Sequence, residues 1–116
     1  MIGLGVDAVD VERFGRVLSR QPRMRDRLFT EDERAIEAAP RLAARFAVKE
    51  AVMKAMGVGL GAFGWHEVET RRTESGAPEL ILRGQAASLA EEQGITRWMV
   101  SLTHTDTTAV AVVTAL

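Results

Sequence analysis

The side chains with the clearest chemical potential in this sequence are two carboxylates, a lysine and a histidine. Asp7 follows a short apolar run, Glu50 and Lys54 lie four residues apart, and His104 lies in a polar turn. Carboxylates can bind a hard metal ion or accept a proton, an ammonium can neutralise an anion, and an imidazole can move a proton. Each residue also has a structural interpretation. Asp7 fits a cap or turn, His104 fits a turn, and Glu50 with Lys54 fits a surface ion pair.

The segment from Pro40 to Met56 is predicted to be the longest helix, because Pro40 suits its first turn and Gly57 suits its C-terminal cap. One broad stripe of this helix is apolar and is expected to face the core; it comprises Leu42, Phe46, Met53 and Met56. Glu50 and Lys54 lie on a different face.

Small and charged neighbours on this helix suggest a binding surface. Ala43 and Ala47 lie beside Glu50 and Lys54, and such small residues would let a bulky ligand approach the helix closely. Lys49 falls inside the apolar stripe, so its ammonium is expected either to reach the edge of the stripe or to meet an anionic ligand.

Shorter elements are predicted around the long helix. A first strand covers Ile2 to Val6 and ends at Asp7, and a helix begins near Asp10 and is stopped by Pro22. Thr30 and Glu33 form a capping box at the start of a short helix. Further strands are expected at 65–73, 79–82, 97–103 and 108–115, and a further helix at 86–93. Because the order lacks regular β–α–β alternation, the sequence predicts an α+β fold in a single domain, 1–116.

The composition excludes several classes of protein. The 116 residues suffice for one domain, and 47% of them are hydrophobic, enough for a core. The net charge of −1 argues against a globally basic nucleic-acid binder, and the lack of cysteine excludes a disulfide framework. The N-terminal residues lack the pattern of a signal peptide, and no apolar run has the length of a membrane span, so a cytoplasmic location is expected.

Three segments taken together resemble the holo-acyl-carrier-protein synthase family of 4′-phosphopantetheinyl transferases. They are Gly3–Asp7 with Arg13, Arg45–Ala51 with Lys54, and Ser101–His104. Gly57 and Gly59, Phe29–Thr30 with Glu33, and Gly76–Pro78 also match family positions. The resemblance runs from Ile2 to about Val113, and the block around Glu50 is its most specific part. The connection Ala38–Pro40 is shorter than in many members, which leaves the entrance geometry open.

The resemblance implies a mostly antiparallel sheet packed with one long and several short helices. It implies Mg²⁺-dependent transfer of the phosphopantetheine arm of coenzyme A to a serine of an apo acyl carrier protein, with release of adenosine 3′,5′-bisphosphate. Asp7 and Glu50 match the metal ligands, and Lys54 matches a position near the pyrophosphate, so these three form the expected catalytic set. Glu50, acting directly or through a metal-bound water, is preferred over His104 as the general base.

The resemblance also implies which residues contact coenzyme A and how the chain assembles. The contact set is Arg45, Lys54, Gly57, Pro78, Ser101 and His104, with Ser101 and His104 near the 3′-phosphate. A homotrimer is implied, in which Asp7, Glu50 and Lys54 come from one subunit and Ser101 and His104 from the next. The apolar last strand and the small size of the domain fit such an assembly.

Arginines on the first predicted helix suggest a surface for an acidic partner. Arg13, Arg16 and Arg20 share one face, and Arg23, Arg25 and Arg27 follow, with only Glu12 and Asp26 opposing them. We expect Arg13, Arg16, Arg20 and Arg23 to contact the acyl carrier protein. The alternative is a solvated helix face, and nucleic acid is less favoured because Phe14 is the only aromatic residue among these arginines.

Two other functions remain open from the sequence. One is a coenzyme A or nucleotide-binding module without catalysis, and the other is a structural oligomerisation domain. Which carrier protein is used, whether from fatty-acid or polyketide synthesis, and whether acylated coenzyme A is accepted are also open.

Overall fold

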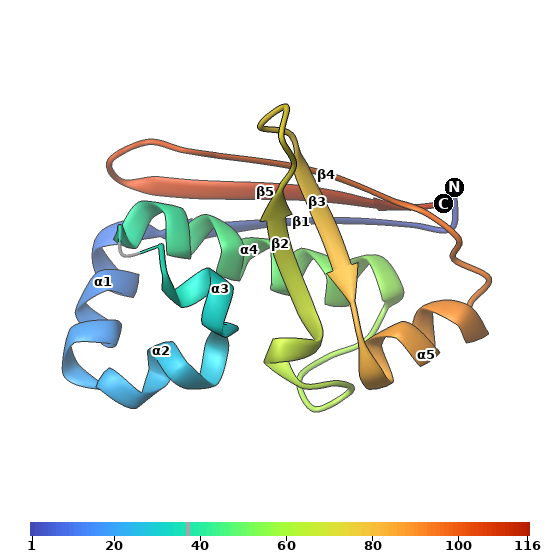
Figure 1. Cartoon of the computed structure of the whole chain (residues 1–116), viewed down its shortest axis with the longest axis horizontal. Helices are drawn as coiled ribbons and strands as arrows, with labels where there is room; N and C mark the ends of the chain where they lie inside the picture. Colours follow the sequence, from blue (N-terminus) through green and yellow to red (C-terminus); the bar gives the residue numbers. More distant parts are fainter. Residues whose placement is uncertain (37) are drawn as a thin grey trace.

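A three-stranded antiparallel sheet covers one side of the molecule, and the helices lie on its other side (Figure 1). The computed structural model describes residues 1–36 and 38–116. In chain order the elements are β1 (Gly3–Asp10), α1 (Val11–Arg20), α2 (Pro22–Leu28), α3 (Glu31–Arg34), α4 (Ala39–Met56), η1 (Trp65–Glu67), β2 (Val68–Arg72), β3 (Pro78–Leu82), α5 (Gly84–Glu92), β4 (Trp98–His104) and β5 (Thr108–Ala115). This arrangement confirms the predicted α+β class.

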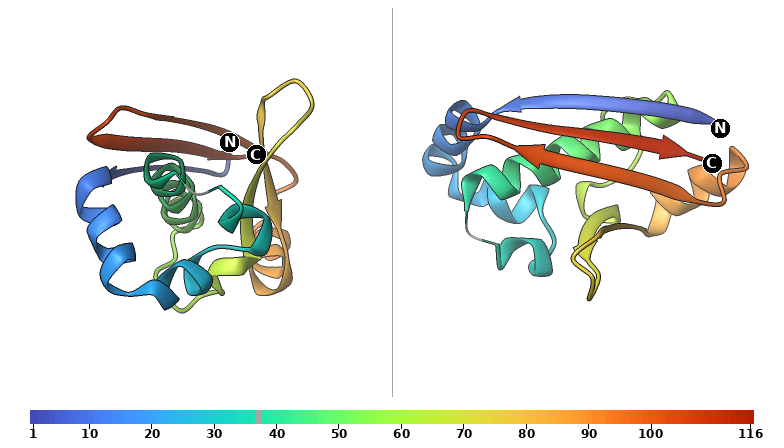
Figure 2. Two further views of the ribbon diagram at one scale, coloured as in Figure 1. Left: turned by 60° about the vertical axis from the view of Figure 1, so that its left-hand side comes forward. Right: turned by 90° about the horizontal axis from the view of Figure 1, so that it is seen from above.

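The strands form two antiparallel sheets, which confirms the antiparallel arrangement that the resemblance implied. In the larger sheet the order is β1–β5–β4, and seen from above the three strands lie side by side with β5 in the middle (Figure 2). β2 and β3 form a separate hairpin whose tip projects from the body of the molecule (Figure 1). Gly76 in the turn of this hairpin has a φ of +86°, a conformation that favours glycine.

Two glycines let β1 lie directly against α4. A Cβ atom at Gly3 would lie 1.9 Å from the carbonyl oxygen of Ala55, and one at Gly5 would lie 1.9 Å from that of Ala51. No other residue fits at such a separation. Because side chains alternate along a strand, Asp7 shares the face of Gly5 and is therefore placed against the same helix.

The chain passes from β1 straight into α1. Asp10 caps α1, since its Oδ1 accepts a hydrogen bond from the backbone N–H of Arg13 at 2.9 Å. The strand thus continues to Asp10, and the predicted end at Asp7 was wrong. The helix ends at Arg20, as Pro22 predicted, but Pro22 then occupies the first turn of α2, a helix that the sequence analysis missed. Proline is tolerated there because the first turn needs no N–H donor.

The predicted capping box at α3 is confirmed. The N–H of Glu33 donates to the Thr30 hydroxyl at 3.3 Å, and the N–H of Thr30 donates to Glu33 Oε1 at 3.1 Å.

The central helix α4 buries Leu42, Met53 and Met56 in the core, as predicted, but its buried surface extends well beyond the predicted stripe. Ala43 and Ala47 are both 0% exposed and pack within the hydrophobic core. Their small size therefore admits neighbouring elements of the protein and not a ligand, contrary to expectation. Phe46, expected in the core, is only partly buried.

Neither expectation for Lys49 was correct. Its side chain is 1% exposed, and its ammonium donates to Glu33 Oε1 at 2.8 Å, to the carbonyl of Trp65 at 2.9 Å and to the carbonyl of Val68. The anion that Lys49 meets is therefore the carboxylate of Glu33 within the protein, and not a ligand. The segment after α4 also differs from the prediction, because the strand expected from Trp65 begins with the 3₁₀ turn η1 and becomes extended only at Val68.

Among the described helices, none combines the length and the apolar character needed to cross a membrane.

Candidate functional site

Asp7, Glu50 and Lys54 converge from β1 and α4, as the sequence analysis predicted. The Lys54 ammonium donates to Asp7 Oδ1 at 3.0 Å and to the carbonyl oxygen of Val6 at 3.0 Å. Glu50 lies one helical turn before Lys54, which places it on the same face of α4. The Asp7 side chain is 16% exposed and that of Lys54 53%, so the cluster lies at the surface of the protein and is open to a ligand.

The charges in this cluster are not balanced. Burial raises the pKa of Glu50, the neighbouring carboxylate of Asp7 raises it further, and Lys54 opposes both effects. The raised pKa of Glu50 means that a negative charge on Glu50, next to the one on Asp7, is disfavoured in the free protein. A bound cation would remove this repulsion.

The carboxylate pair fits a magnesium ion better than a metal bound wholly by protein. Among the described residues, no group of three or more histidine, cysteine, aspartate or glutamate side chains is arranged to hold a metal. Mg²⁺ commonly takes one or two carboxylates and completes its shell with waters and substrate phosphates. Asp7 and Glu50 supply that number of hard oxygen donors.

The three residues line a pocket of about 690 Å³ that also has an aromatic wall. The wall comprises Phe14, Phe46 and Trp65. The Phe14 and Phe46 ring centroids are 5.2 Å apart, and those of Phe46 and Trp65 are 5.3 Å apart. The pocket therefore combines a charged end with an apolar side.

A second, smaller pocket of about 150 Å³ contains three of the residues predicted to contact coenzyme A, namely Arg45, Pro78 and Ser101. Thr70 and Arg72 also line it, and the sequence analysis missed both. Because side chains alternate along a strand, Thr70 and Arg72 could have been recognised as sharing one face of β2. Which face of β2 lines the pocket, however, depends on how the strand packs beside α4, and this is known only from the fold.

Arg45 in this second pocket is 3% exposed and incompletely bonded. Within the described part of the chain, its Nε and the hydroxyl of Thr70 are buried without a hydrogen-bond partner. Burial lowers the pKa of Arg45, Arg41 and Arg72 lower it further, and Glu33 opposes them. Clustered guanidinium groups and unpaired polar atoms of this kind favour an anion.

The remaining predicted contact residues are not gathered into either pocket. Gly57 ends α4 with a φ of +68° and its N–H bonds to the carbonyl of Lys54. His104 is exposed at the end of β4. Because Ser101 and His104 are three residues apart on one strand, the pleat turns their side chains to opposite faces of the sheet. Their roles stay predictions.

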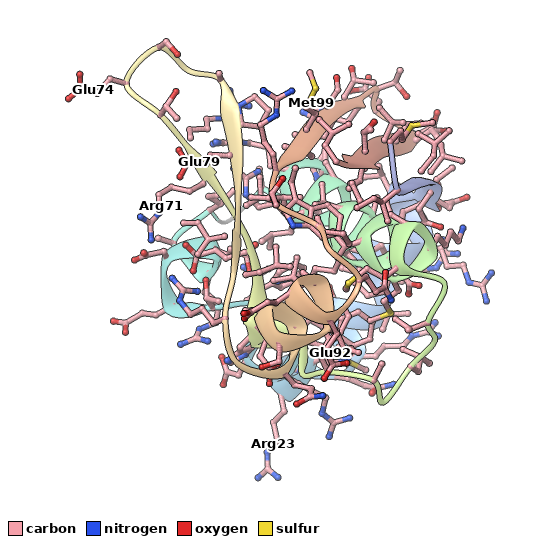
Figure 3. All side chains as sticks on the ribbon, turned by 90° about the vertical axis from the view of Figure 1, so that its right-hand side faces the viewer. Arg23, Arg71, Glu74, Glu79, Glu92 and Met99 are labelled. Carbon is pink, nitrogen blue, oxygen red and sulfur yellow. The ribbon has the colours of Figure 1, made fainter. Side chains whose placement is uncertain are left out.

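The four arginines predicted to contact a partner are all exposed. Arg13 lines the larger pocket beside Asp7, which connects this surface to the carboxylates. Arg16 is engaged with Glu12 at 2.7 Å, in an i, i+4 ion pair. Arg23 extends away from the body of the molecule (Figure 3).

Comparison with known proteins identifies relatives that span nearly the whole chain. A holo-[acyl-carrier-protein] synthase of Beutenbergia cavernae is 48% identical over 104 residues, covering 90% of this chain and 88% of that protein. The crystal structure of the synthase from Neisseria meningitidis superposes with a TM-score of 0.90 at 32% identity, covering 100% of this chain and 99% of the other.

A further solved structure carries a ligand. The synthase of Bacillus anthracis, in complex with coenzyme A (3′,5′-ADP), superposes with a TM-score of 0.81 at 28% identity and covers 98% of this chain and 95% of its own. The family model described as the 4′-phosphopantetheinyl transferase superfamily matches residues 3–113. The chain therefore belongs to the 4′-phosphopantetheinyl transferase superfamily.

Proposed function

We propose that this protein transfers the 4′-phosphopantetheine group of coenzyme A to a serine of an apo acyl carrier protein and releases adenosine 3′,5′-bisphosphate. The observation that carries the proposal is the convergence of Asp7, Glu50 and Lys54 in one pocket of a chain from this superfamily. Its relatives named holo-[acyl-carrier-protein] synthase span nearly the whole chain, which supports the same substrates here.

Asp7 and Glu50 would hold Mg²⁺. The bound ion would neutralise the pyrophosphate of coenzyme A, which is the main electrostatic demand of phosphoryl transfer. Hydrogen bonds to Asp7 and to the carbonyl of Val6 orient the Lys54 ammonium toward the pocket. There it would offset the charge that develops on the leaving phosphate.

Glu50 serves as the general base. Its carboxylate lines the pocket and would accept the proton of the serine hydroxyl, directly or through a water, as the hydroxyl oxygen attacks the β-phosphorus. The phosphoanhydride bond to the nucleotide then breaks, and Lys54 faces the departing phosphate.

The second pocket serves the nucleotide. Arg45 supplies an unpaired N–H beside Thr70 and Ser101, which suits the 3′-phosphate of coenzyme A. Among the described residues no side chain lines both pockets, so one coenzyme A molecule would draw on the carboxylate half of one subunit and the Ser101–His104 half of the next.

The outer face of the larger sheet provides a surface for such a trimer. Four apolar side chains are exposed on it, namely Leu4 (58%), Val6 (57%), Met99 (57%) and Val112 (38%). An apolar face of this kind favours association. Arg13, Arg20 and Arg23 would receive the acidic carrier protein at the rim of the same site, and a cytoplasmic location fits these substrates.

A binding assay combined with product analysis tests the proposal. The protein is titrated with coenzyme A in the presence of Mg²⁺, and the release of adenosine 3′,5′-bisphosphate is then followed after apo carrier protein is added. We expect binding and release. Binding without release would indicate a binding module, and no binding at all would indicate a structural domain.

A further inference from the structure

The buried ion pair between Lys49 and Glu33 joins four segments of the chain. Each side chain is 1% exposed. The Lys49 ammonium, on α4, donates to Glu33 Oε1 at 2.8 Å, to the carbonyl of Trp65 in η1 at 2.9 Å, and to the carbonyl of Val68 in β2. All three of its N–H donors therefore have acceptors.

Glu33 completes the same network from the other side. Its Oε1 also accepts from the N–H of Thr30 at 3.1 Å, and its Oε2 accepts from the N–H of Thr70 at 3.1 Å. The start of α3, the middle of α4, η1 and β2 thus meet at one charged pair.

This pair is connected to the larger pocket through two residues that line it, Glu50 and Trp65. Lys49 precedes Glu50 in the chain, and the Trp65 carbonyl that it binds belongs to the residue whose ring stacks on Phe46 at 5.3 Å. Phe46 in turn contacts Phe14 at 5.2 Å. The Lys49 ammonium therefore connects α4, the helix that carries Glu50 and Phe46, to η1, the segment that carries Trp65 of the aromatic wall.

Stability alone does not account for a charged pair at this position. The cost of removing two charges from water offsets their attraction, so a well-packed apolar pair of similar volume is commonly as stable. Apolar contacts, however, permit small sliding movements, whereas an ammonium with three fixed acceptors defines one separation between α4 and η1.

We propose that Lys49 is a positioning residue that holds Trp65, the part of the aromatic wall contributed by η1, at a fixed distance from Glu50. It touches neither substrate and acts through the backbone of Trp65. The inference rests on the proposed function for its effect on catalysis, but the position of Trp65 can be measured without any substrate.

Three variants test this role. Each is made in a Trp98→Phe background, so that Trp65 is the only tryptophan of the sequence and its fluorescence is measured alone. Lys49→Met removes the ammonium. Lys49→Met with Glu33→Gln removes both charges and keeps the capping box, since glutamine also serves there. Ile95→Ala is the control, because Ile95 is a buried core residue outside both the pair and the pocket.

We expect Lys49→Met to lower kcat by about 10- to 100-fold with a smaller change in the KM for coenzyme A. A displaced Trp65 would disturb the alignment of the reacting groups more than it would weaken the binding of coenzyme A to α4 and β1. Its Trp65 emission should shift to longer wavelength. The double variant should regain thermal stability relative to Lys49→Met, because no unpaired charge stays buried, but should keep the low kcat and the shifted emission. Ile95→Ala should lose stability only.

Recovery of kcat and of the wild-type emission in the double variant would show that the pair is merely structural. A loss of kcat in Lys49→Met no greater than in Ile95→Ala, compared at equal folded fractions, would overturn the proposal as well. If the wild-type protein transfers nothing, the proposed function fails, and the emission of Trp65 still decides whether Lys49 positions this residue.

Discussion

Two lysines five residues apart on α4 have opposite surroundings and opposite roles. Lys49 is 1% exposed and has three protein acceptors, so no donor is left for a ligand. Lys54 is 53% exposed and is held at the pocket by Asp7. An exposed, preoriented ammonium can reach a phosphate, whereas a buried and satisfied one can only organise the protein.

Arg45 differs from both lysines because it is buried but incompletely bonded. Its Nε has no partner within the described residues, and its Nη1 donates to the carbonyl of Arg41 only at 3.4 Å. A buried donor without an acceptor costs stability unless a ligand supplies one. We therefore propose that Arg45 recognises the 3′-phosphate of coenzyme A.

Arg45→Met is expected to raise the KM for coenzyme A by about tenfold or more, since a hydrogen bond to a charged group contributes about 1.5–3 kcal/mol. The KM for 3′-dephospho-coenzyme A should change little, because that substrate lacks the phosphate. Steady-state kinetics with both substrates measures the difference, and Arg97→Met, at an exposed position away from both pockets, is the control. An equal rise for both substrates would show that Arg45 serves the fold and not the phosphate.

At the scale of elements, the contact between β1 and α4 sets the position of the carboxylates. Gly3 and Gly5 bring the strand onto the helix, and Asp7 follows on the same face. The motif Gly–Leu–Gly–Val–Asp is thus explained by packing as well as by chemistry, since the glycines position the aspartate.

Gly5→Ala is expected to destabilise the protein by about 3 kcal/mol or more, because the added methyl group would lie 1.9 Å from a backbone oxygen that cannot yield. Activity should fall even in the molecules that remain folded, because β1 moves and carries Asp7 with it. Gly15→Ala is the matched control: the nearest atom to its new Cβ would be the Ala39 Cβ at 3.8 Å, so it should stabilise α1 by about 0.5–1 kcal/mol. Thermal unfolding and kinetics of both variants check the prediction, and an unchanged melting temperature for Gly5→Ala would contradict it.

Helices α1 and α2 carry the arginines that we propose to contact the carrier protein, and two of those on α1 are the most direct to test. Reversal of charge in Arg13→Glu with Arg20→Glu should raise the KM for the carrier protein by about tenfold and leave coenzyme A binding unchanged, because these side chains are exposed and attract an acidic surface. Added salt should weaken the wild-type interaction in the same way. The control is Arg97→Glu. Carrier-protein kinetics that are insensitive both to salt and to the double reversal would show that the partner binds elsewhere.

The sequence predicted the elements better than it predicted their packing. Periodicity and caps located α4, the capping box at Thr30 and the last strand, because these signals are local. The interior partner of Lys49 could not be predicted, since Glu33 lies 16 residues away and meets it only after folding. Thr70 and Arg72 were missed for the same reason. Asp7, Glu50 and Lys54 were identified only when their segments were considered together.

At the scale of the whole molecule, the apolar outer face of the larger sheet and the arginine surface lie on different sides. Met99 of the outer face and Arg23 of the arginine surface project from opposite ends in side view (Figure 3). Subunits can therefore associate through the sheet while the arginines stay accessible to a carrier protein.

If the proposed trimer forms through this face, Met99→Asp is expected to convert it to monomers and to abolish transfer, because a charge within an apolar interface is costly and the site would lose its second half. Analytical ultracentrifugation and a transfer assay on the same samples check both effects. Ser88→Asp, on the exposed face of α5, should remain trimeric and active. A wild-type protein that is monomeric and fully active would remove the shared site.

Mixing two inactive variants tests whether each site draws residues from two subunits of the proposed trimer. If Asp7→Ala and His104→Ala are each inactive and are co-refolded in equal amounts, about a quarter of the sites should combine two intact halves and recover activity, as a closed ring of heterologous contacts permits. Asp7→Ala mixed with Glu50→Ala should recover nothing, since both defects lie in one half. Recovery only in the second mixture would reverse the assignment of residues to subunits.

Asp7 and Glu50 are proposed to support metal-dependent transfer of phosphopantetheine, and mass spectrometry of the carrier protein tests this role most directly. A panel of apo carrier proteins from fatty-acid and polyketide synthesis is incubated with coenzyme A, Mg²⁺ and the wild-type protein, Asp7→Ala or Glu50→Ala. We predict that the wild type adds one phosphopantetheine group to the serine of at least one carrier, and that excess chelator or either substitution abolishes the addition while the far-ultraviolet circular dichroism stays unchanged. No mass gain on any carrier, or full modification in the presence of chelator, would contradict the account.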